Sequence, residues 1–216
     1  MQVSGVRPMP YERDQRWESG MNPSEPPRSI GPDDIVLFLD FDGVLHPNAA
    51  FRTRRGIELR APGALMMHAD ILQNILHDFP SVKISLSTSW VRMLGYQKAR
   101  SALPTGLQER TVSATWHSRM RHTAREGYDL FTRYEQICGA VTRAGITQWI
   151  ALDDDPDFSW PINDSRLVRC DSHKGLASSS TQEELRTKLA AVAERASDGP
   201  QSGPNIHRSP SADCCQ

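Results

Sequence analysis

The feature that most constrains the fold of this 216-residue chain is a short apolar run that ends in two acidic residues. Residues 35–39 read Ile-Val-Leu-Phe-Leu, and Asp40, Phe41, Asp42 and Gly43 follow directly. An apolar run of this length, bounded by turn residues, is typical of a strand buried on both faces of a parallel sheet. Ligands of open α/β sheets bind at the carboxyl ends of the strands. Two acids at such a place repel each other unless a cation or a shared proton relieves them, which favours Mg²⁺.

Strand-like and helix-like segments alternate along the rest of the chain. Further buried strands are expected over residues 82–87, 149–152 and 167–170, with a short strand near Val112. Helices are expected over residues 65–78, 90–102 and about 130–144, with a last helix behind a capping box at Thr181. The alternation predicts an α/β fold with a doubly wound, mainly parallel sheet. The polar connection over residues 46–63 is too short for a large cap domain, so a minimal cap or flap is expected.

Polar residues also follow two of the other expected strands. Ser87, Thr88 and Ser89 form a hydroxyl-rich turn, where a hydroxyl and a backbone N–H can hold a phosphate oxygen. Such hydroxyls also serve as local backbone caps. Residues 153–155 are three consecutive aspartates, whose mutual repulsion makes a purely structural role expensive.

The run from Asp40 to Leu45, Asp-Phe-Asp-Gly-Val-Leu, resembles the first motif of the haloacid dehalogenase-like (HAD) superfamily of phosphatases and phosphotransferases. The hydroxyl-rich turn looks like the second motif of that family. This resemblance places Thr88 on the phosphate, with Ser87 and Ser89 as near alternatives. Residues 153–155 are similar to the fourth motif, whose acids complete the Mg²⁺ shell. Asp153 is then the first choice of ligand and Asp154 the second.

The third motif of the family is a cation, commonly lysine, and two residues compete for it here. Arg133 precedes the acidic strand at the start of an expected helix, and its guanidinium can hold a phosphate with two N–H groups. Lys98 is the only lysine between Thr88 and Asp153, but its position suggests the solvated face of a helix. Arg133 is the preferred candidate, and Lys98 remains the alternative.

The resemblance implies a Mg²⁺-dependent phosphohydrolase that works through an aspartyl-phosphate. Asp40 would be the nucleophile, and Asp42 would act first as acid and then as base. Gly43 would remove a side chain where the backbone approaches the phosphate. The implied phosphate-binding residues are Thr88, Ser89, Arg133 and Gly43, and the implied metal ligands are Asp40, Asp42 (through its carbonyl), Asp153 and Asp154.

The turn over residues 86–90 and the small cap also resemble a bacterial HAD group linked to RNA-repair proteins. A small cap leaves the site open to large molecules. The resemblance therefore implies a phosphorylated small molecule or a phosphorylated nucleic-acid end as the substrate. Two other hypotheses stay open, namely a catalytically idle phosphate- or nucleotide-binding module of the same fold and a phosphotransferase using the same residues.

The composition indicates which residues fold and which classes of function are disfavoured. Residues 1–33 and 197–216 are rich in Pro, Ser and Gly without a hydrophobic period, so disordered tails are expected around a HAD-like core domain over residues 34–196. The net charge of −1 argues against a broad nucleic-acid surface. The chain has no apolar run of roughly 18 residues and no secretory signal. A cytoplasmic protein with no membrane association and no stable protein partner is expected, with Cys138 and Cys170 as reduced core residues.

Overall fold

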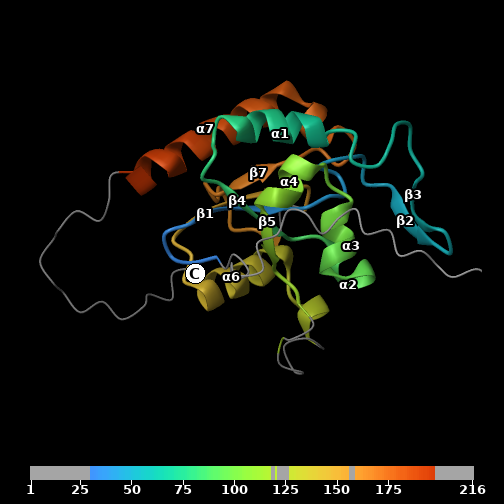
Figure 1. Ribbon diagram of the computed structural model, residues 1–216, viewed down its shortest axis with the longest axis horizontal. Coiled ribbons are helices and arrows are strands. Elements are labelled where there is room, and N and C mark those ends of the chain that lie inside the picture. Colours follow the sequence, from blue (N-terminus) through green and yellow to red (C-terminus); the bar gives the residue numbers. More distant parts are fainter. Residues whose placement is uncertain (1–29, 118–119, 121–126, 156–158, 198–216) are drawn as a thin grey trace, which may run out of the picture.

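Among the residues that the computed structural model describes (30–117, 120, 127–155 and 159–197), five parallel strands form a central sheet (Figure 1). In their order across the sheet they are β5 (Thr111–Ala114), β4 (Lys83–Leu86), β1 (Ile35–Leu39), β6 (Gln148–Asp153) and β7 (Leu167–Arg169). All neighbouring pairs are parallel. After β1 the chain adds β4 and then β5 on one side of it, and later adds β6 and then β7 on the other side. The strand order therefore reverses beside β1, which is where open α/β sheets bind ligands.

The sheet is buried on both faces, as two apolar clusters demonstrate. Ile35, Leu37 and Leu39 of β1 belong to the cluster on the face that α1 and α7 cover (Figure 1). Val36 and Phe38, which alternate with them, belong to the cluster on the α6 face. All five side chains are at most 5% exposed. The predicted doubly wound, mainly parallel α/β fold is confirmed, because alternate residues of an apolar strand need an apolar layer on each side.

Helices and short 3₁₀ turns connect the strands. In chain order they are α1 (Ala69–His77), α2 (Ser89–Leu94), α3 (Tyr96–Ser101), α4 (Thr105–Arg110), η1 (Tyr128–Leu130), α6 (Arg133–Ala144), η3 (Gly175–Ala177) and α7 (Ser179–Ser197). The helix predicted over 65–78 is shorter than expected, and the one predicted from about 130 begins at Arg133, behind a capping box of Thr132 and Glu135.

Two details of the helix predictions are wrong. The single helix expected over 90–102 is broken into α2 and α3 at Gly95, whose φ of 88° is incompatible with a right-handed helix. The capping box expected at Thr181 lies inside α7, which begins two residues earlier. The hydroxyl of Ser178 receives the Thr181 N–H instead, at 3.5 Å. Several hydroxyl residues in a row leave the first helical residue undetermined by sequence.

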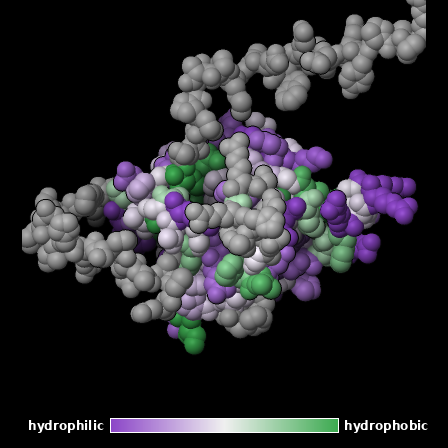
Figure 2. Space-filling view, turned by 90° about the horizontal axis from the view of Figure 1, so that it is seen from below, coloured by the Kyte–Doolittle hydropathy of each residue, from purple (hydrophilic) through white to green (hydrophobic). Residues whose placement is uncertain are grey.

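A hairpin of β2 (Ala50–Thr53) and β3 (Gly56–Leu59) stands in the connection after β1 and projects beyond the sheet (Figure 1). This hairpin is the minimal flap that the length of the connection predicted. Four exposed arginines lie on this hairpin or directly after it, namely Arg52, Arg54, Arg55 and Arg60. Figure 2 shows a strongly hydrophilic tip on the side of the molecule where Figure 1 places this hairpin.

The two expected tails lie almost entirely outside the described residues, which begin at residue 30 and end at residue 197. Both cysteines of the described part, Cys138 and Cys170, are buried, and neither forms a disulfide there. In that part of the chain no helix combines the length and the apolar character that crossing a bilayer requires.

Candidate active site

The ends of three adjacent strands meet at one edge of the sheet. Asp40 follows β1, and its N–H donates to the Leu152 carbonyl of β6 at 3.1 Å. Ser87 follows β4, and its N–H donates to the Leu39 carbonyl of β1 at 2.8 Å. Asp153 is the last residue of β6. The backbone ladder thus brings the acids after β1, the hydroxyls after β4 and the acids after β6 to a common place.

Three carboxylates converge there. Asp40, Asp153 and Asp154 each offer an oxygen, and these atoms lie within 4.8 Å of one another. Asp40 and Asp153 are 4% and 1% exposed. Burial, and the charge of nearby Asp42, raise the pKa of Asp40 to about 6 against the opposing effect of Arg133. Burial and the charge of Asp40 likewise raise the pKa of Asp153 well above its usual range. Several buried like charges are unfavourable alone, so the cluster is suited to a cation.

Arg133 is the cation that the chain itself supplies to this cluster. It is the first residue of α6, and its side chain lies 3.2 Å from Asp40 Oδ2 through one terminal nitrogen and 3.2 Å from Asp153 Oδ2 through Nε. Burial opposes its charge, but these two carboxylates raise the pKa of Arg133 above its usual value. Lys98 instead lies exposed on α3. The structure therefore brings Arg133, and not Lys98, to the acids.

Asp42 occupies a different environment from the three clustered acids. Its Oδ1 lies 3.1 Å from His46 Nε2, and its Oδ2 accepts the indole N–H of Trp90 at 3.1 Å. No sequence pattern predicts a role for either partner. In the sequence, His46 begins a polar connection and Trp90 begins an expected helix. A contact between positions 42 and 90 depends on the β1–β4 pairing, so no local spacing could have revealed it.

The hydroxyl-rich turn after β4 presents its residues differently. Thr88 is 5% exposed and precedes α2, and its Oγ1 accepts the Trp90 N–H at 3.4 Å. Ser89 is exposed. The Ser87 hydroxyl is buried and has no hydrogen-bond partner among the described residues. Thr88 and Ser89, but not Ser87, line the cavity beside the acids.

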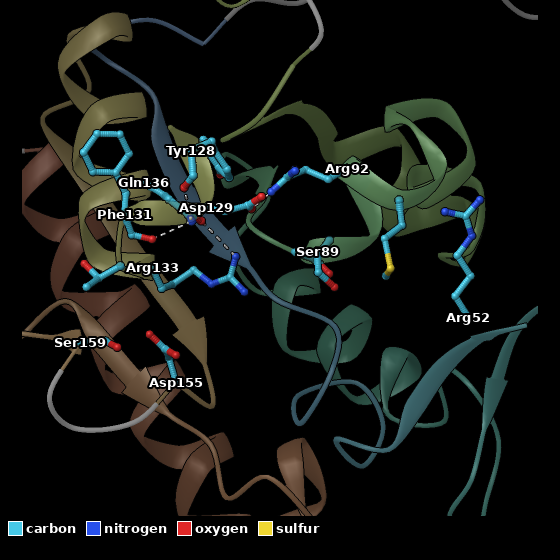
Figure 3. Close-up of a pocket in the computed structure, with 13 residues that line it drawn as sticks. Arg52, Ser89, Arg92, Tyr128, Asp129, Phe131, Arg133, Gln136, Asp155 and Ser159 are labelled. Atoms are coloured by element: carbon cyan, nitrogen blue, oxygen red, sulfur yellow. Dashed lines mark hydrogen bonds and ion pairs between the residues drawn. The ribbon is translucent and has the colours of Figure 1, made fainter. Parts of the chain in front are cut away.

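The cavity beside the acids has a volume of about 630 Å³ and is much larger than a phosphate ion. Figure 3 shows Arg133 and Asp155 on one side of it, Ser89 in the middle and Arg52 of the flap on the far side. Arg92 of α2 also lines it and forms an ion pair with Asp129. The Asp155 N–H donates to Asp153 Oδ1 at 3.0 Å, which ties the end of the acidic run to the cluster. The cavity can accommodate a group considerably larger than phosphate.

Gly43 is required by the backbone and by Asp154. Its φ is +69°, in the left-handed region, and a Cβ atom at this position would overlap the Asp154 carboxylate. Asp154 is fixed there because Asn48 Nδ2 donates to its Oδ2 at 2.9 Å. A residue larger than glycine would thus displace one of the three clustered acids.

Gly43→Ala is therefore expected to lower the free energy of unfolding more than Gly145→Ala does. Gly145 is also left-handed, with a φ of +67°, but the nearest atom that a Cβ there would meet is Pro32 Cγ at 3.5 Å, an ordinary van der Waals distance. Both variants carry the left-handed penalty of about 1–2 kcal/mol. Only Gly43→Ala adds the overlap, worth roughly 1–3 kcal/mol. Urea unfolding of the two variants measures the difference, and equal losses would contradict the overlap.

The same site lies inside the part of the chain that matches a known family. No curated protein and no solved structure gives a match. Residues 36–181 match the family described as the HAD domain in Swiss Army Knife RNA repair proteins. This stretch runs from β1 into the first turn of α7 and covers more than half of the 216 residues. The predicted resemblance to a HAD group related to RNA-repair proteins is confirmed. With its three acids, partly buried arginine and hydroxyl turn at one sheet edge, the chain belongs to this HAD family and is a HAD-type hydrolase.

Proposed function

We propose that this protein is a Mg²⁺-dependent phosphohydrolase that acts on a phosphomonoester through an aspartyl-phosphate on Asp40. The observation that carries the proposal is the convergence of Asp40, Asp153, Asp154 and Arg133 beside a cavity that Thr88 also lines. Phosphoryl transfer depends mainly on positioning and on charge compensation around the phosphate. A buried nucleophile flanked by acids for a metal and by a fixed guanidinium supplies both.

The donor set suits Mg²⁺. Asp40, Asp153 and Asp154 would hold it through carboxylate oxygens, and Asp42 would contribute its backbone carbonyl. Mg²⁺ prefers such oxygen ligands, together with substrate phosphate and water. Bound Mg²⁺ would offset the negative charge between the nucleophile and the phosphate. Within the cluster, Arg133 is the cation that the described residues supply to Asp40 and Asp153, so negative charge remains for a divalent ion.

In the first step, an oxygen of Asp40 attacks phosphorus and the bond to the leaving oxygen breaks. The bonding electrons go to that oxygen, which takes a proton from Asp42. Arg133, Thr88 and Ser89 hold the phosphoryl oxygens from the cavity wall. In the second step, Asp42 takes a proton from water as the water attacks phosphorus. The bond to Asp40 breaks, and phosphate and the free carboxylate are regenerated.

A phosphorylated nucleic-acid end is the substrate class that the surroundings favour. The flap presents Arg52, Arg54, Arg55 and Arg60, and Arg60 stacks over the exposed ring of Phe51 at 4.7 Å. Arginines on a projecting element suit the phosphates of a polynucleotide, and an exposed ring suits a base. Arg52 also lines the cavity, so the flap borders the reaction site. The description of the matched family points to the same class.

The test is phosphate release by the purified protein with and without Mg²⁺. We expect turnover of p-nitrophenyl phosphate that disappears with a chelator and returns with added Mg²⁺. Oligonucleotides with a 3′- or 5′-phosphate are expected to react with a higher kcat/KM than free nucleotides. Phosphate binding without turnover of any phosphomonoester would instead support an idle binding module. Transfer of the phosphoryl group to an added alcohol in preference to water would support a phosphotransferase.

A further inference from the structure

We propose that His46 and Trp90 form a clamp that positions Asp42 for proton transfer to the leaving group. The proposal rests on the proposed function, because it concerns the acid of that reaction. The clamp consists of two N–H donors, His46 Nε2 and Trp90 Nε1, each 3.1 Å from a different oxygen of Asp42. With one donor on each oxygen, rotation of the carboxylate breaks both hydrogen bonds.

The imidazole of His46 is oriented by the backbone behind it. The Met66 N–H donates to His46 Nδ1 at 3.4 Å, so the ring proton lies on Nε2, where it is donated to Asp42. Met66 has a φ of 60°, which is uncommon for a residue other than glycine. His46 is fully buried. The donor that faces Asp42 is thus held from the opposite edge of the ring.

The indole of Trp90 is fixed by aromatic packing. It is 3% exposed and meets Phe41 edge to face, with ring centroids 5.5 Å apart and planes at 81°. The His46 ring also lies near it, with ring centroids 5.7 Å apart. A side chain packed on two aromatic neighbours loses little further freedom on holding a hydrogen bond. Trp90 can therefore hold Asp42 in one orientation.

Trp90 also connects the acid to the phosphate-binding turn. Its backbone N–H donates to Thr88 Oγ1 at 3.4 Å, while its indole N–H donates to Asp42. One residue thus ties the acid that follows β1 to the hydroxyl that follows β4. The clamp sets the position of the acid relative to the phosphate-binding hydroxyl, since both are hydrogen-bonded to the same residue.

The clamp leaves room for the reaction. Each oxygen of Asp42 has about two lone-pair positions, so one accepted N–H leaves a second position, which can carry the proton that goes to the leaving-group oxygen. The effect of the clamp on the rate depends on the leaving group of the substrate. An alkyl oxygen needs a proton as it leaves, whereas p-nitrophenolate leaves readily without one. Removing a clamp donor should therefore slow alkyl phosphates much more than p-nitrophenyl phosphate.

Trp90→Phe tests this, because it keeps an aromatic ring and removes the indole N–H. We expect kcat/KM for an alkyl phosphate to fall about 10- to 100-fold, a part of what acid–base help supplies. The kcat/KM for p-nitrophenyl phosphate should change by less than about threefold. We compare kcat/KM because kcat also contains the second step, in which Asp42 acts as base and which is the same for both substrates. Trp160→Phe is the matched control. Trp160 is 4% exposed, and its Nε1 has no hydrogen-bond partner among the described residues.

Replacement of His46 gives a second, independent measurement. Glutamine can place an N–H near the position of Nε2, whereas leucine cannot. His46→Gln should therefore keep a higher kcat/KM for the alkyl phosphate than His46→Leu, with kcat/KM for p-nitrophenyl phosphate similar in the two. Thermal unfolding shows that each compared variant is folded at the assay temperature.

The outcomes separate the clamp from the reaction it serves. If the wild-type protein hydrolyses both substrates and Trp90→Phe lowers kcat/KM by the same factor for both, the clamp is overturned and the proposed function stands. The clamp is also overturned if Trp160→Phe produces the same selective loss. If the wild-type protein hydrolyses no phosphomonoester, the proposed function fails, and the role of Asp42 as acid fails with it.

Discussion

Asp40→Asn is expected to reduce phosphate release by roughly 10⁴-fold or more, because the neutral amide cannot act as the nucleophile. The same change should not destabilise the metal-free protein at neutral pH. Burial and neighbouring acids raise the pKa of Asp40, so the folded state holds its proton more tightly than the unfolded state does. Stability is therefore lost as the pH rises through the raised pKa, and the asparagine variant escapes this loss. Steady-state kinetics and thermal unfolding at several pH values measure both effects.

Asp164→Asn is the matched control for this variant. Asp164 is also a buried carboxylate, but Arg166 donates to its two oxygens at 2.9 and 2.7 Å, and the pKa of Asp164 is lowered. This variant should lose roughly 1–3 kcal/mol of unfolding free energy and keep its turnover. Its loss should vanish in acid, where the wild-type carboxyl is also protonated. Substantial turnover by Asp40→Asn, or a stability loss like that of Asp164→Asn, would contradict the assignment of Asp40.

The sequence predicts that three residues of the site, Asp40, Thr88 and Asp153, lie close together. Each follows or ends an apolar run, and parallel strands in one sheet end at one edge. Strand β1 has five consecutive apolar residues, which a sheet exposed on one face would not need. The fold class and the meeting of these residues therefore follow from local pattern and topology.

The contacts that complete the site could not be predicted in this way. Arg133 and Lys98 both precede the acidic strand, and only the docking of α6 under β6 decides between them. The contact of Trp90 with Asp42 joins residues 48 positions apart, and it depends on the pairing of β1 with β4. The sequence pattern therefore predicts which residues lie at the ends of the strands. It does not predict which side chains from other elements contact those residues.

The second large effect is expected from Arg133→Met. The guanidinium lies between the buried carboxylates of Asp40 and Asp153, 3.2 Å from each, and its side chain is only 20% exposed. Its removal leaves both acids unpaired, which should lower the free energy of unfolding by about 3–5 kcal/mol without Mg²⁺. Turnover should fall by about 10³-fold, because the phosphoryl group loses a fixed positive charge. Arg133→Lys should recover part of each loss, since it keeps the charge but not the forked geometry.

Mg²⁺ separates the two roles of this residue. A divalent ion bound by Asp40 and Asp153 would offset their repulsion, so added Mg²⁺ should stabilise Arg133→Met more than the wild-type protein. The ion cannot replace the guanidinium on the phosphate, so turnover should stay low. Lys98→Met, which removes an exposed cation from α3, should change neither property. Thermal unfolding with and without Mg²⁺, beside kcat and KM, measures both. A loss of turnover in Lys98→Met rather than in Arg133→Met would transfer the phosphate-binding role to Lys98.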